Sequence, residues 1–590
     1  MDVELLKLKG DHPMKSSVIL KRAFSYIKSE LPLIFLSLFL LLINVLLSSA
    51  LPILMQQYVD KLSDTVNLTL QYIIGLSVGY LAINVVNQGF LYLESMILQK
   101  VGQKVVYSLR LEVFSHIEKM SINQFADMPV GALVTRVANY TNSLSTLFTD
   151  TIVMFIKNIL LILVSYGIMF YYSWKLSLIM LVIVLIIFVS TMIFRYKIGK
   201  NYKKERTAIS DLNAFLSENL AGMKMIQIFN QEERKKEEFK IKNETLRKRR
   251  FAIVQNYALY RPFMSFLTYI GLALTFFMGL KFNLSSGEII AFYLSVFNFF
   301  EPVQGLADQF NNIQNAKSAC EKLFNLLDVQ SEVLDSPDSI EIDSFKGKIE
   351  FKNVWFAYEK DNYILKDVSF VVNPGETVAF VGATGAGKTT ILSLLVRNYN
   401  IQKGEILIDD INIRNIKIEC LRKHIGQMLQ DVFLFSGSIK SNITLRDDSF
   451  SDEEVKKACK YVNADTFINK LEKGLNSEVI EKGDNLSQGQ RQLLSFARTI
   501  LHKPDILILD EATANIDTET ERIIQNSLNK MKNIGTMLVV AHRISTIKNA
   551  DKIICLQDGK IIEEGSHEEL LQLRGYYYNL CELKENGGID

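Results

Sequence analysis

The sequence predicts an all-α membrane domain with long cytosolic helical extensions, followed by a mixed α/β domain. Two observations support this fold class. Long apolar segments are confined to roughly the first half of the 590-residue chain. From Ile349 onward, short apolar runs typical of buried strands alternate with helix-like segments, as in domains built around a largely parallel sheet.

Residues 1–30 are expected to form a cytosolic segment with an elbow helix. Val18 to Lys28 alternates apolar and basic residues at helical spacing, which suits a short helix lying on the inner membrane surface. The segment lacks a short apolar core followed by a small-residue cleavage site, so no cleaved signal peptide is expected.

Residues 31–327 are expected to form a transmembrane domain of six helices. Leu31 to Leu54 contains no charged residue and would span about 36 Å as a helix, enough for the hydrocarbon core of a bilayer. Polar residues interrupt the second and the sixth of the six spans, and the other five apolar runs follow the first. These five runs lie at about 71–98, 151–172, 176–194, 257–280 and 289–300 with its continuation.

The charge distribution predicts the orientation of these spans. Arg195 to Arg250 contains sixteen Lys or Arg residues against eight Asp or Glu, whereas the three proposed outer connections carry one Lys each. Basic connections stay on the cytoplasmic side. We therefore expect a multi-pass protein of the cytoplasmic (inner or plasma) membrane with both termini in the cytoplasm.

Two long inner connections, 100–149 and 197–257, consist mainly of good helix formers, so the spans should continue into the cytosol. Each connection is interrupted once, near 125–131 and near 218–224, where a hairpin should turn over. After Leu327 the composition changes to Ser, Asp, Glu and Pro, which predicts a linker at 328–348 before an α/β domain at 349–585.

Two charged residues within the spans are ambiguous. Lys157 lies about 25 Å below Trp174 along the third span, near the inner interface, where snorkelling is expected. Glu301 lies about 18 Å into the sixth span, and charges at that depth usually face protein or water. Glu301 could attract a cationic substrate or pair with Arg261.

A phosphate-binding loop is the most informative motif in the chain. Residues 382–389 read Gly-Ala-Thr-Gly-Ala-Gly-Lys-Thr and fit the template G-x-x-x-x-G-K-[ST]. A buried strand, 378–381, precedes the loop and a helix follows it, so backbone N–H groups and a helix end would face a phosphate. A glycine-rich turn is the alternative. The expected nucleotide-binding residues here are Gly382, Ala383, Thr384, Gly385, Ala386, Gly387, Lys388, Thr389 and Thr390.

Two further strands carry polar residues at their carboxyl ends. Ile506–Leu509 is followed by Asp510, expected to hold Mg²⁺ together with Thr389, and by Glu511, expected to polarise the attacking water. The buried run 537–541 ends at His542. Ligands of open α/β sheets bind at that edge. The motifs therefore predict a nucleotide and Mg²⁺ as cofactors.

The full set of motifs resembles the ATP-binding cassette (ABC) superfamily. Leu486-Ser487-Gln488-Gly489-Gln490 leads into a helix-like segment, and Gln430 lies in Met428-Leu429-Gln430-Asp431. These motifs, the phosphate loop, the acidic strand and the histidine occur in the family's order after six spans. The chain resembles half of a type I (type IV fold) ABC exporter of the bacterial multidrug, lipid or peptide type.

The resemblance implies that the nucleotide is ATP, and it implies roles for individual residues. Tyr358 would stack on adenine, although it could simply pack on its strand, and Gln430 would sense Mg²⁺ and the attacking water. Ser487, Gly489 and Gln490 would contact ATP held by an opposite subunit. Further implied features are the catalytic set Lys388, Glu511 and His542, the crossing loop at Asp517, the X-loop 481–483, and coupling helices at the two interruptions.

Two departures from the family pattern point to a partner. The signature has Gln488 where Gly is usual, and the crossing loop reads Ala514-Asn515-Ile516-Asp517 instead of Ser-Ala-Leu-Asp. With Glu511 and His542 intact, this is similar to the complete-Walker-site subunit of heterodimeric exporters, whose partner is degenerate. Harmless drift in a homodimer is the alternative.

The expected function is ATP-driven export of a hydrophobic or amphipathic substrate (drug, lipid or peptide) by one half of a dimer in contact with membrane lipids. A homodimeric lipid-flippase-type exporter and a regulatory or channel-type ABC protein are the alternatives. The net charge of +2 favours no nucleic-acid partner. Five cysteines without CxxC spacing suggest isolated thiols in a reducing compartment.

Overall fold

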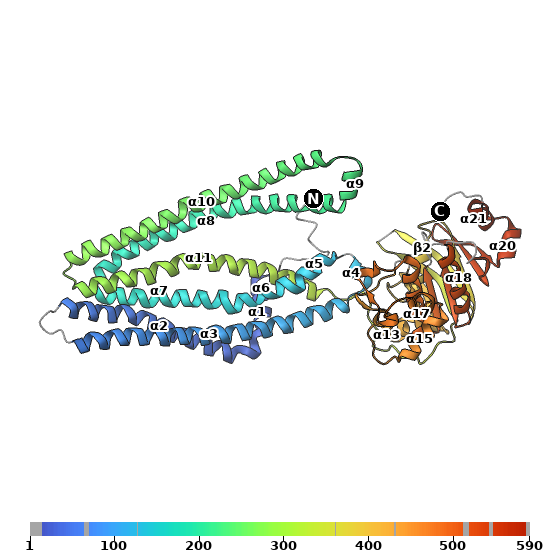
Figure 1. Cartoon of the computed structure of the whole chain (residues 1–590), viewed down its shortest axis with the longest axis horizontal. Coiled ribbons are helices and arrows are strands. Elements are labelled where there is room, and N and C mark those ends of the chain that lie inside the picture. Colours follow the sequence, from blue (N-terminus) through green and yellow to red (C-terminus); the bar gives the residue numbers. More distant parts are fainter. Residues whose placement is uncertain are drawn as a thin grey trace. The chain divides into compact units, whose positions relative to one another are not determined.

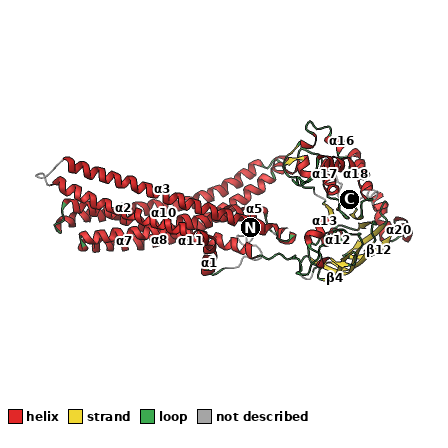
Figure 2. Ribbon diagram, turned by 90° about the horizontal axis from the view of Figure 1, so that it is seen from below, coloured by secondary structure: helices red, strands yellow, loops and turns green. Residues whose placement is uncertain are grey.

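The computed structural model describes residues 14–63, 70–126, 128–359, 362–429, 432–510, 518–541 and 547–585. The chain separates into two compact units. Unit 1 comprises Met1–Glu118 and Met128–Gln330, and unit 2 comprises Lys119–Asp127 and Ser331–Asp590. The described part of unit 1 is helical, whereas strands occur in unit 2 (Figure 2). The predicted fold class, a helical transmembrane domain fused to an α/β domain, is confirmed.

Long helices running side by side make up unit 1 (Figure 1). Short π-helical turns at Arg136–Tyr140 and Leu147–Thr151 separate three of the shorter helices, and a 3₁₀ turn at Lys28–Glu30 precedes α2. The helices are α1 (Ser16–Ile27), α2 (Leu31–Ser63), α3 (Leu70–Glu118), α5 (Val130–Thr135), α6 (Thr141–Thr146), α7 (Ile152–Tyr172), α8 (Trp174–Ala221), α9 (Met223–Ile228), α10 (Glu232–Lys281) and α11 (Ser286–Asp328).

Length and composition identify the membrane-crossing helices. At 33 residues, α2 is about 50 Å long, well beyond the hydrocarbon core of a bilayer. α11 covers the sixth predicted span, but its apolar run ends at Glu301. Among the described residues, five stretches are long and apolar enough to cross a membrane: Ser16–Ser63, Ile73–Glu118, Val130–Tyr172, Trp174–Ala221 and Glu232–Lys281.

The two predicted interruptions coincide with breaks between helices. Near 218–224, α8 ends at Ala221 and α9 begins at Met223, at the tip of the α8–α10 hairpin (Figure 1). Near 125–131, α4 (Ile122–Ala126) is followed by α5 at Val130. α4 belongs to unit 2, where Asn123 Nδ2 donates to Glu332 Oε2 at 3.3 Å.

Helix α1 forms where the alternation of apolar and basic residues predicts it, and it is bound to α11. Arg22 Nη1 donates to Asp328 Oδ1 at 2.6 Å, and the same guanidinium lies 4.8 Å from the ring centroid of Phe324. The ambiguous Glu301 is exposed, while Arg261 places its guanidinium 5.8 Å from the ring centroid of Tyr257. Among the side chains that the structure describes, no ion pair joins Glu301 to Arg261.

Unit 2 contains a six-stranded sheet in the order β12-β11-β3-β10-β9-β6, parallel except for β12. An antiparallel sheet in the order β2-β1-β4-β5 and a two-stranded β7–β8 ladder accompany it. The strands are β1 (Ile349–Ala357), β2 (Tyr363–Val372), β3 (Thr377–Val381), β4 (Lys403–Ile408), β5 (Ile411–Asn412), β6 (Ile425–Met428), β7 (Gly437–Ser438), β8 (Glu478–Val479), β9 (Ile506–Asp510), β10 (Thr536–Val540), β11 (Lys552–Gln557) and β12 (Lys560–Gly565).

In the sequence, the helices of unit 2 other than α4 lie between these strands or follow the last of them. Three 3₁₀ turns, at Ile413–Asn415, Gly474–Asn476 and Glu481–Gly483, complete its described secondary structure. The helices are α12 (Lys388–Leu395), α13 (Ile418–His424), α14 (Ile439–Ile443), α15 (Asp452–Tyr461), α16 (Asp465–Ile468), α17 (Gln488–Leu501), α18 (Thr518–Met531), α20 (His567–Leu573) and α21 (Tyr576–Glu585).

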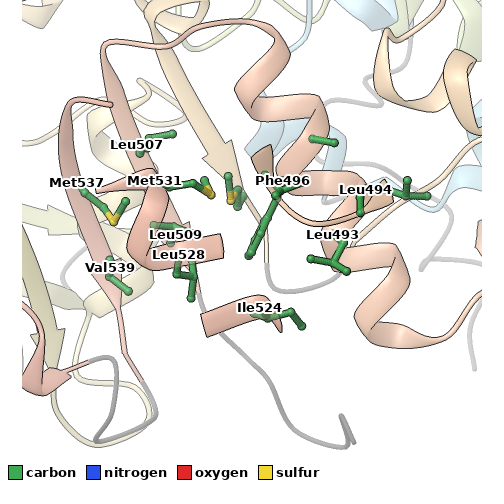
Figure 3. Close-up of a cluster of buried hydrophobic side chains, with 14 of the residues drawn as sticks. Leu493, Leu494, Phe496, Leu507, Leu509, Ile524, Leu528, Met531, Met537 and Val539 are labelled. Carbon is green, nitrogen blue, oxygen red and sulfur yellow. The ribbon is translucent and has the colours of Figure 1, made fainter. Parts of the chain in front are cut away.

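The central strands of the six-stranded sheet, β3, β9 and β10, are buried on both faces. Alternate residues of β3 point to opposite sides: Val378 and Phe380 join one apolar cluster, Ala379 and Val381 the other. The second cluster contains Leu493, Leu494 and Phe496 of α17 packed with β9, β10 and α18 (Figure 3). Parallel sheets are stable when both faces are covered in this way.

The five cysteines all lie among the described residues and form no disulfide. Four of them are buried. Burial raises the pKa of the Cys459 and Cys555 thiols to about 12, so both stay protonated and unreactive at neutral pH.

Phe496→Ala should destabilise unit 2 by about 3–5 kcal/mol, because the ring is only 2% exposed and its removal leaves a cavity between α17 and the sheet. Tryptophan fluorescence during thermal unfolding measures this in a Trp174→Phe background, which leaves Trp355 as the single tryptophan of the chain. Leu573→Ala, at a residue 66% exposed, is the control and should leave the midpoint unchanged. Equal midpoints for the two variants would contradict the packing.

Candidate nucleotide-binding site

The phosphate loop has a backbone that glycine makes possible. Gly385 and Gly387 have φ of +84° and +101°, a left-handed conformation that L side chains rarely adopt. A Cβ on Gly387 would also lie 2.6 Å from Leu365 Cδ2. Gly387 is the N-cap of α12, so the loop delivers its backbone N–H groups at the positive end of that helix.

Lysine and threonine follow at the first turn of α12. Lys388 is 6% exposed, and its Nζ donates to the carbonyl oxygens of Gly382 and Ala383 at 2.8 and 2.9 Å. Thr389 is exposed, and its Oγ1 donates to Asp510 Oδ1 at 3.4 Å. Residues 121 positions apart in the chain therefore meet at one sheet edge.

The strand register explains this meeting. Phe380 of β3 pairs with Val540 of β10, and Val540 pairs with Asp510 of β9. The three strands are parallel, so their carboxyl ends lie together. Asp510 ends β9 next to the phosphate loop, as the sequence predicts.

Oxygen donors at this edge fit Mg²⁺. The ion prefers carboxylate and hydroxyl oxygens and usually takes only one or two protein carboxylates, with phosphate and water oxygens completing its octahedron. Thr389 Oγ1 and Asp510 Oδ1 supply such a pair. Among the described residues, no group of three or more His, Cys, Asp or Glu could hold a metal alone.

Tyr358 lies beside the loop with an exposed ring. Its hydroxyl hydrogen-bonds to Thr390 Oγ1 at 3.1 Å, and its ring is 45% exposed. Edge-on contacts with Phe356 and Tyr399, at 4.8 and 5.1 Å between centroids, hold the ring from one side. This geometry is compatible with both roles expected for Tyr358, because the ring packs on its strand and still has an exposed surface on which adenine could stack.

Several predicted residues fall outside the described part of the chain. Gln430, Glu511, His542 and Asp517 are among them. Their neighbours are described: Met428 ends β6, Asp510 ends β9 and Ala541 follows β10.

The signature segment caps helix α17. Ser487 Oγ accepts from the Gln490 backbone N–H, and Gln490 Oε1 accepts from the Ser487 N–H, which together form a capping box. Gly489 is buried, whereas Gln488 is exposed at the first helical position. The segment therefore presents a helix N-terminus with Gln488 on its surface.

Arg491 has a role that the sequence pattern does not predict. Its Nη1 donates to the carbonyl oxygens of Gly483 and Leu486 at 3.2 and 3.3 Å, which joins the X-loop to the signature helix. Lys482 and Gly483 have left-handed φ of 58° and 75° in that loop. An arginine directly after the signature was the available signal.

Comparison with known proteins identifies the chain. The ABC transporter transmembrane region model matches residues 34–303, and the ABC transporter model matches residues 365–514. The chain belongs to the ABC transporter family. The "Probable multidrug resistance ABC transporter ATP-binding/permease protein YheH" of Bacillus subtilis is 38% identical over 84% of the transporter and 74% of that protein.

Two more relatives define the subtype. An "ATP-dependent lipid A-core flippase" of Syntrophus aciditrophicus is 32% identical, covering 96% of the transporter and 94% of that protein. A solved "bacterial Atm1-family ABC exporter with ATP bound" matches with a TM-score of 0.79 and 25% identity, over 94% of the transporter and 98% of that chain. The transporter is a type IV-fold ABC exporter half-transporter, a multi-pass membrane protein that couples ATP hydrolysis to transport.

Thr389→Val should raise the Mg²⁺ concentration required for half-maximal ATP hydrolysis by about tenfold, because the hydroxyl beside Asp510 is lost. Thr389→Ser keeps the hydroxyl and should stay close to wild type. Titrating ATPase activity with Mg²⁺ distinguishes the variants. Wild-type Mg²⁺ dependence in Thr389→Val would contradict the assignment.

Proposed function

We propose that this transporter exports a hydrophobic or amphipathic substrate (a drug, lipid or peptide) across the cytoplasmic membrane, paired with a second, non-identical half-transporter. The observation that carries the ATP-driven part is the contact of Thr389 with Asp510 beside a glycine-shaped phosphate loop. Fusion of this site to long apolar helices favours an exporter, and the multidrug name of the Bacillus relative supports the substrate class.

The residues of one chain would divide the work on ATP. Lys388, with the loop N–H groups of residues 382–387, would hold the β- and γ-phosphates, and Tyr358 would stack on adenine. Thr389, Asp510 and Gln430 would hold Mg²⁺, which neutralises phosphate charge when bound. Glu511 would orient and deprotonate the attacking water, with His542 at the neighbouring strand end.

The second chain would complete each site. Ser487, Gly489 and Gln490 would contact the γ-phosphate of ATP held by the partner, because the N-terminus of α17 attracts negative charge. A subunit alone would then lack half of each site. The transporter therefore needs a dimer for turnover.

Gln488 supports a heterodimer. Its side chain is exposed at the first turn of α17 and would enter the partner's nucleotide site. If that partner site is degenerate, little is lost by an amide side chain there. The ATP on this chain's Lys388 would face the partner's signature and turn over.

Closure on ATP would reach the membrane unit through the helix breaks. α4, near 125–131, clusters with the nucleotide-binding unit, and α9, near 218–224, is a short helix at the tip of a long hairpin. Both would act as coupling helices on the cytoplasmic side, with both termini cytoplasmic and residues 328–348 as the linker. The basic composition of 195–250 supports this orientation.

Glu511→Gln should retain ATP binding and lower turnover by at least 100-fold, because the water loses its base. Lys388→Ala should weaken ATP binding itself. Glu519→Gln, in the first turn of α18, is the matched control and should turn over normally. ATP binding and steady-state hydrolysis by the purified dimer measure both properties. Normal turnover by Glu511→Gln would contradict the assignment of Glu511 as the base for the attacking water.

Gln488→Gly should change turnover of the heterodimer by less than about threefold, whereas a lesion in the partner's signature should reduce turnover severely. The reason is that Gln488 would face the slow site. The chain purified alone should hydrolyse ATP poorly. A stable homodimer with vigorous substrate-stimulated ATPase activity would overturn the heterodimer and favour a homodimeric exporter.

A further inference from the structure

Buried polar side chains form a stripe between α2 and α3. Asn44 and Ser49 of α2 are 5% and 3% exposed, and Asn87 and Glu94 of α3 are 8% and 5% exposed. All four lie within the stretches long and apolar enough to cross a membrane. Polar groups at such positions are costly, and ionisable ones mark functional sites by default.

Hydrogen bonds satisfy only part of this stripe. Asn87 Nδ2 donates to Ser48 Oγ at 2.9 Å, and Asn44 Nδ2 donates to the backbone oxygen of Asn87 at 3.3 Å. Three buried atoms have no hydrogen-bond partner among the described residues: Ser49 Oγ, Asn87 Oδ1 and Glu94 Oε2. Two of these atoms are pure acceptors, so the stripe lacks donors.

A lysine is close to Glu94 without contacting it. Lys157 of α7 is near enough to Glu94 to interact with it electrostatically, yet no ion pair or hydrogen bond joins them in the described structure. Leu98, one turn from Glu94, and Val153, one turn from Lys157, belong to one apolar cluster with Leu41 and Val45 of α2, so α3 and α7 both pack against α2 here. The carboxylate thus has a cation nearby and a free oxygen.

We propose that Glu94 forms a subsite for the cationic group of an amphipathic substrate, such as a protonated amine or an amidinium-like nitrogen, and that Asn87 accepts from a second N–H donor elsewhere on the same substrate. This rests on the proposed function and names the substrate class. An N–H cation satisfies the free Glu94 oxygen with a charge-assisted hydrogen bond. Asn87 lies two helical turns away, about 10 Å along α3, and accepts from a second donor.

The neighbouring helices supply the rest of the subsite. The apolar cluster of Leu41, Val45, Leu98 and Val153 borders the stripe and suits the apolar body of the ligand. Lys157 competes with the ligand for the carboxylate. Because Glu94 is buried, entry requires α7 to move away from α2 and α3, which is a motion of the kind that alternating access provides.

Three proteins in nanodiscs test the proposal: wild type, Glu94→Gln and Lys157→Gln, each assembled with its partner. Fluorescence anisotropy gives the Kd for rhodamine 6G, a cation with N–H donors, and for uncharged Nile red. Glu94→Gln should weaken rhodamine 6G binding about tenfold or more, because a charge-assisted hydrogen bond is lost. Lys157→Gln should strengthen it severalfold. Nile red binding should change less than twofold in either variant.

The effect of Lys157→Gln on dye binding distinguishes a role of Glu94 in substrate recognition from a purely structural role. A merely structural Glu94–Lys157 pair predicts that both substitutions impair binding of both dyes, and this result overturns the proposal even if Glu94→Gln folds poorly. Unchanged rhodamine 6G binding in Glu94→Gln, or none by wild type, also overturns it. If the Kd values change as expected but ATP-driven export is not observed, the proposed function is contradicted and the subsite is still supported.

Discussion

The alignment of three buried parallel strands determines the position of the proposed nucleotide-binding site of this transporter. β3, β10 and β9 have apolar side chains that are almost fully buried, and their register places Phe380, Val540 and Asp510 side by side. The phosphate loop leaves one of these strands, and the acidic end belongs to another. The contact of Thr389 with Asp510 follows from this alignment, so the site depends on the core beneath it.

The same core connects the site to the signature segment. Side chains of α17 pack on β9, β10 and α18, and the N-terminus of α17 carries Ser487 and Gly489 (Figure 3). Arg491 then joins that helix to the X-loop through two carbonyl oxygens. A displacement of the phosphate loop would therefore also affect the surface that would face a partner. Close packing transmits such strain because it leaves few voids.

Features that depend on residues close together in the sequence could be predicted, whereas features that depend on tertiary contacts could not. The glycine spacing of the phosphate loop and the buried strands before Asp510 and His542 are local, so the α/β fold and the expectation of a phosphate loop beside Asp510 could be drawn from the sequence. The anchoring of the X-loop by Arg491 requires a tertiary contact that no spacing reveals. The stripe of Asn44, Asn87 and Glu94 depends on which faces of α2 and α3 meet, and a single sequence does not contain that.

The central claim is that ATP bound at this sheet edge drives export. Inside-out membrane vesicles containing the transporter and its partner test it, because the proposed orientation places the nucleotide-binding units on the side of the added ATP. The account predicts that rhodamine 6G accumulates inside wild-type vesicles only with hydrolysable ATP and Mg²⁺. Accumulation without ATP, or ATP-driven loss of preloaded dye from the vesicles, would contradict it.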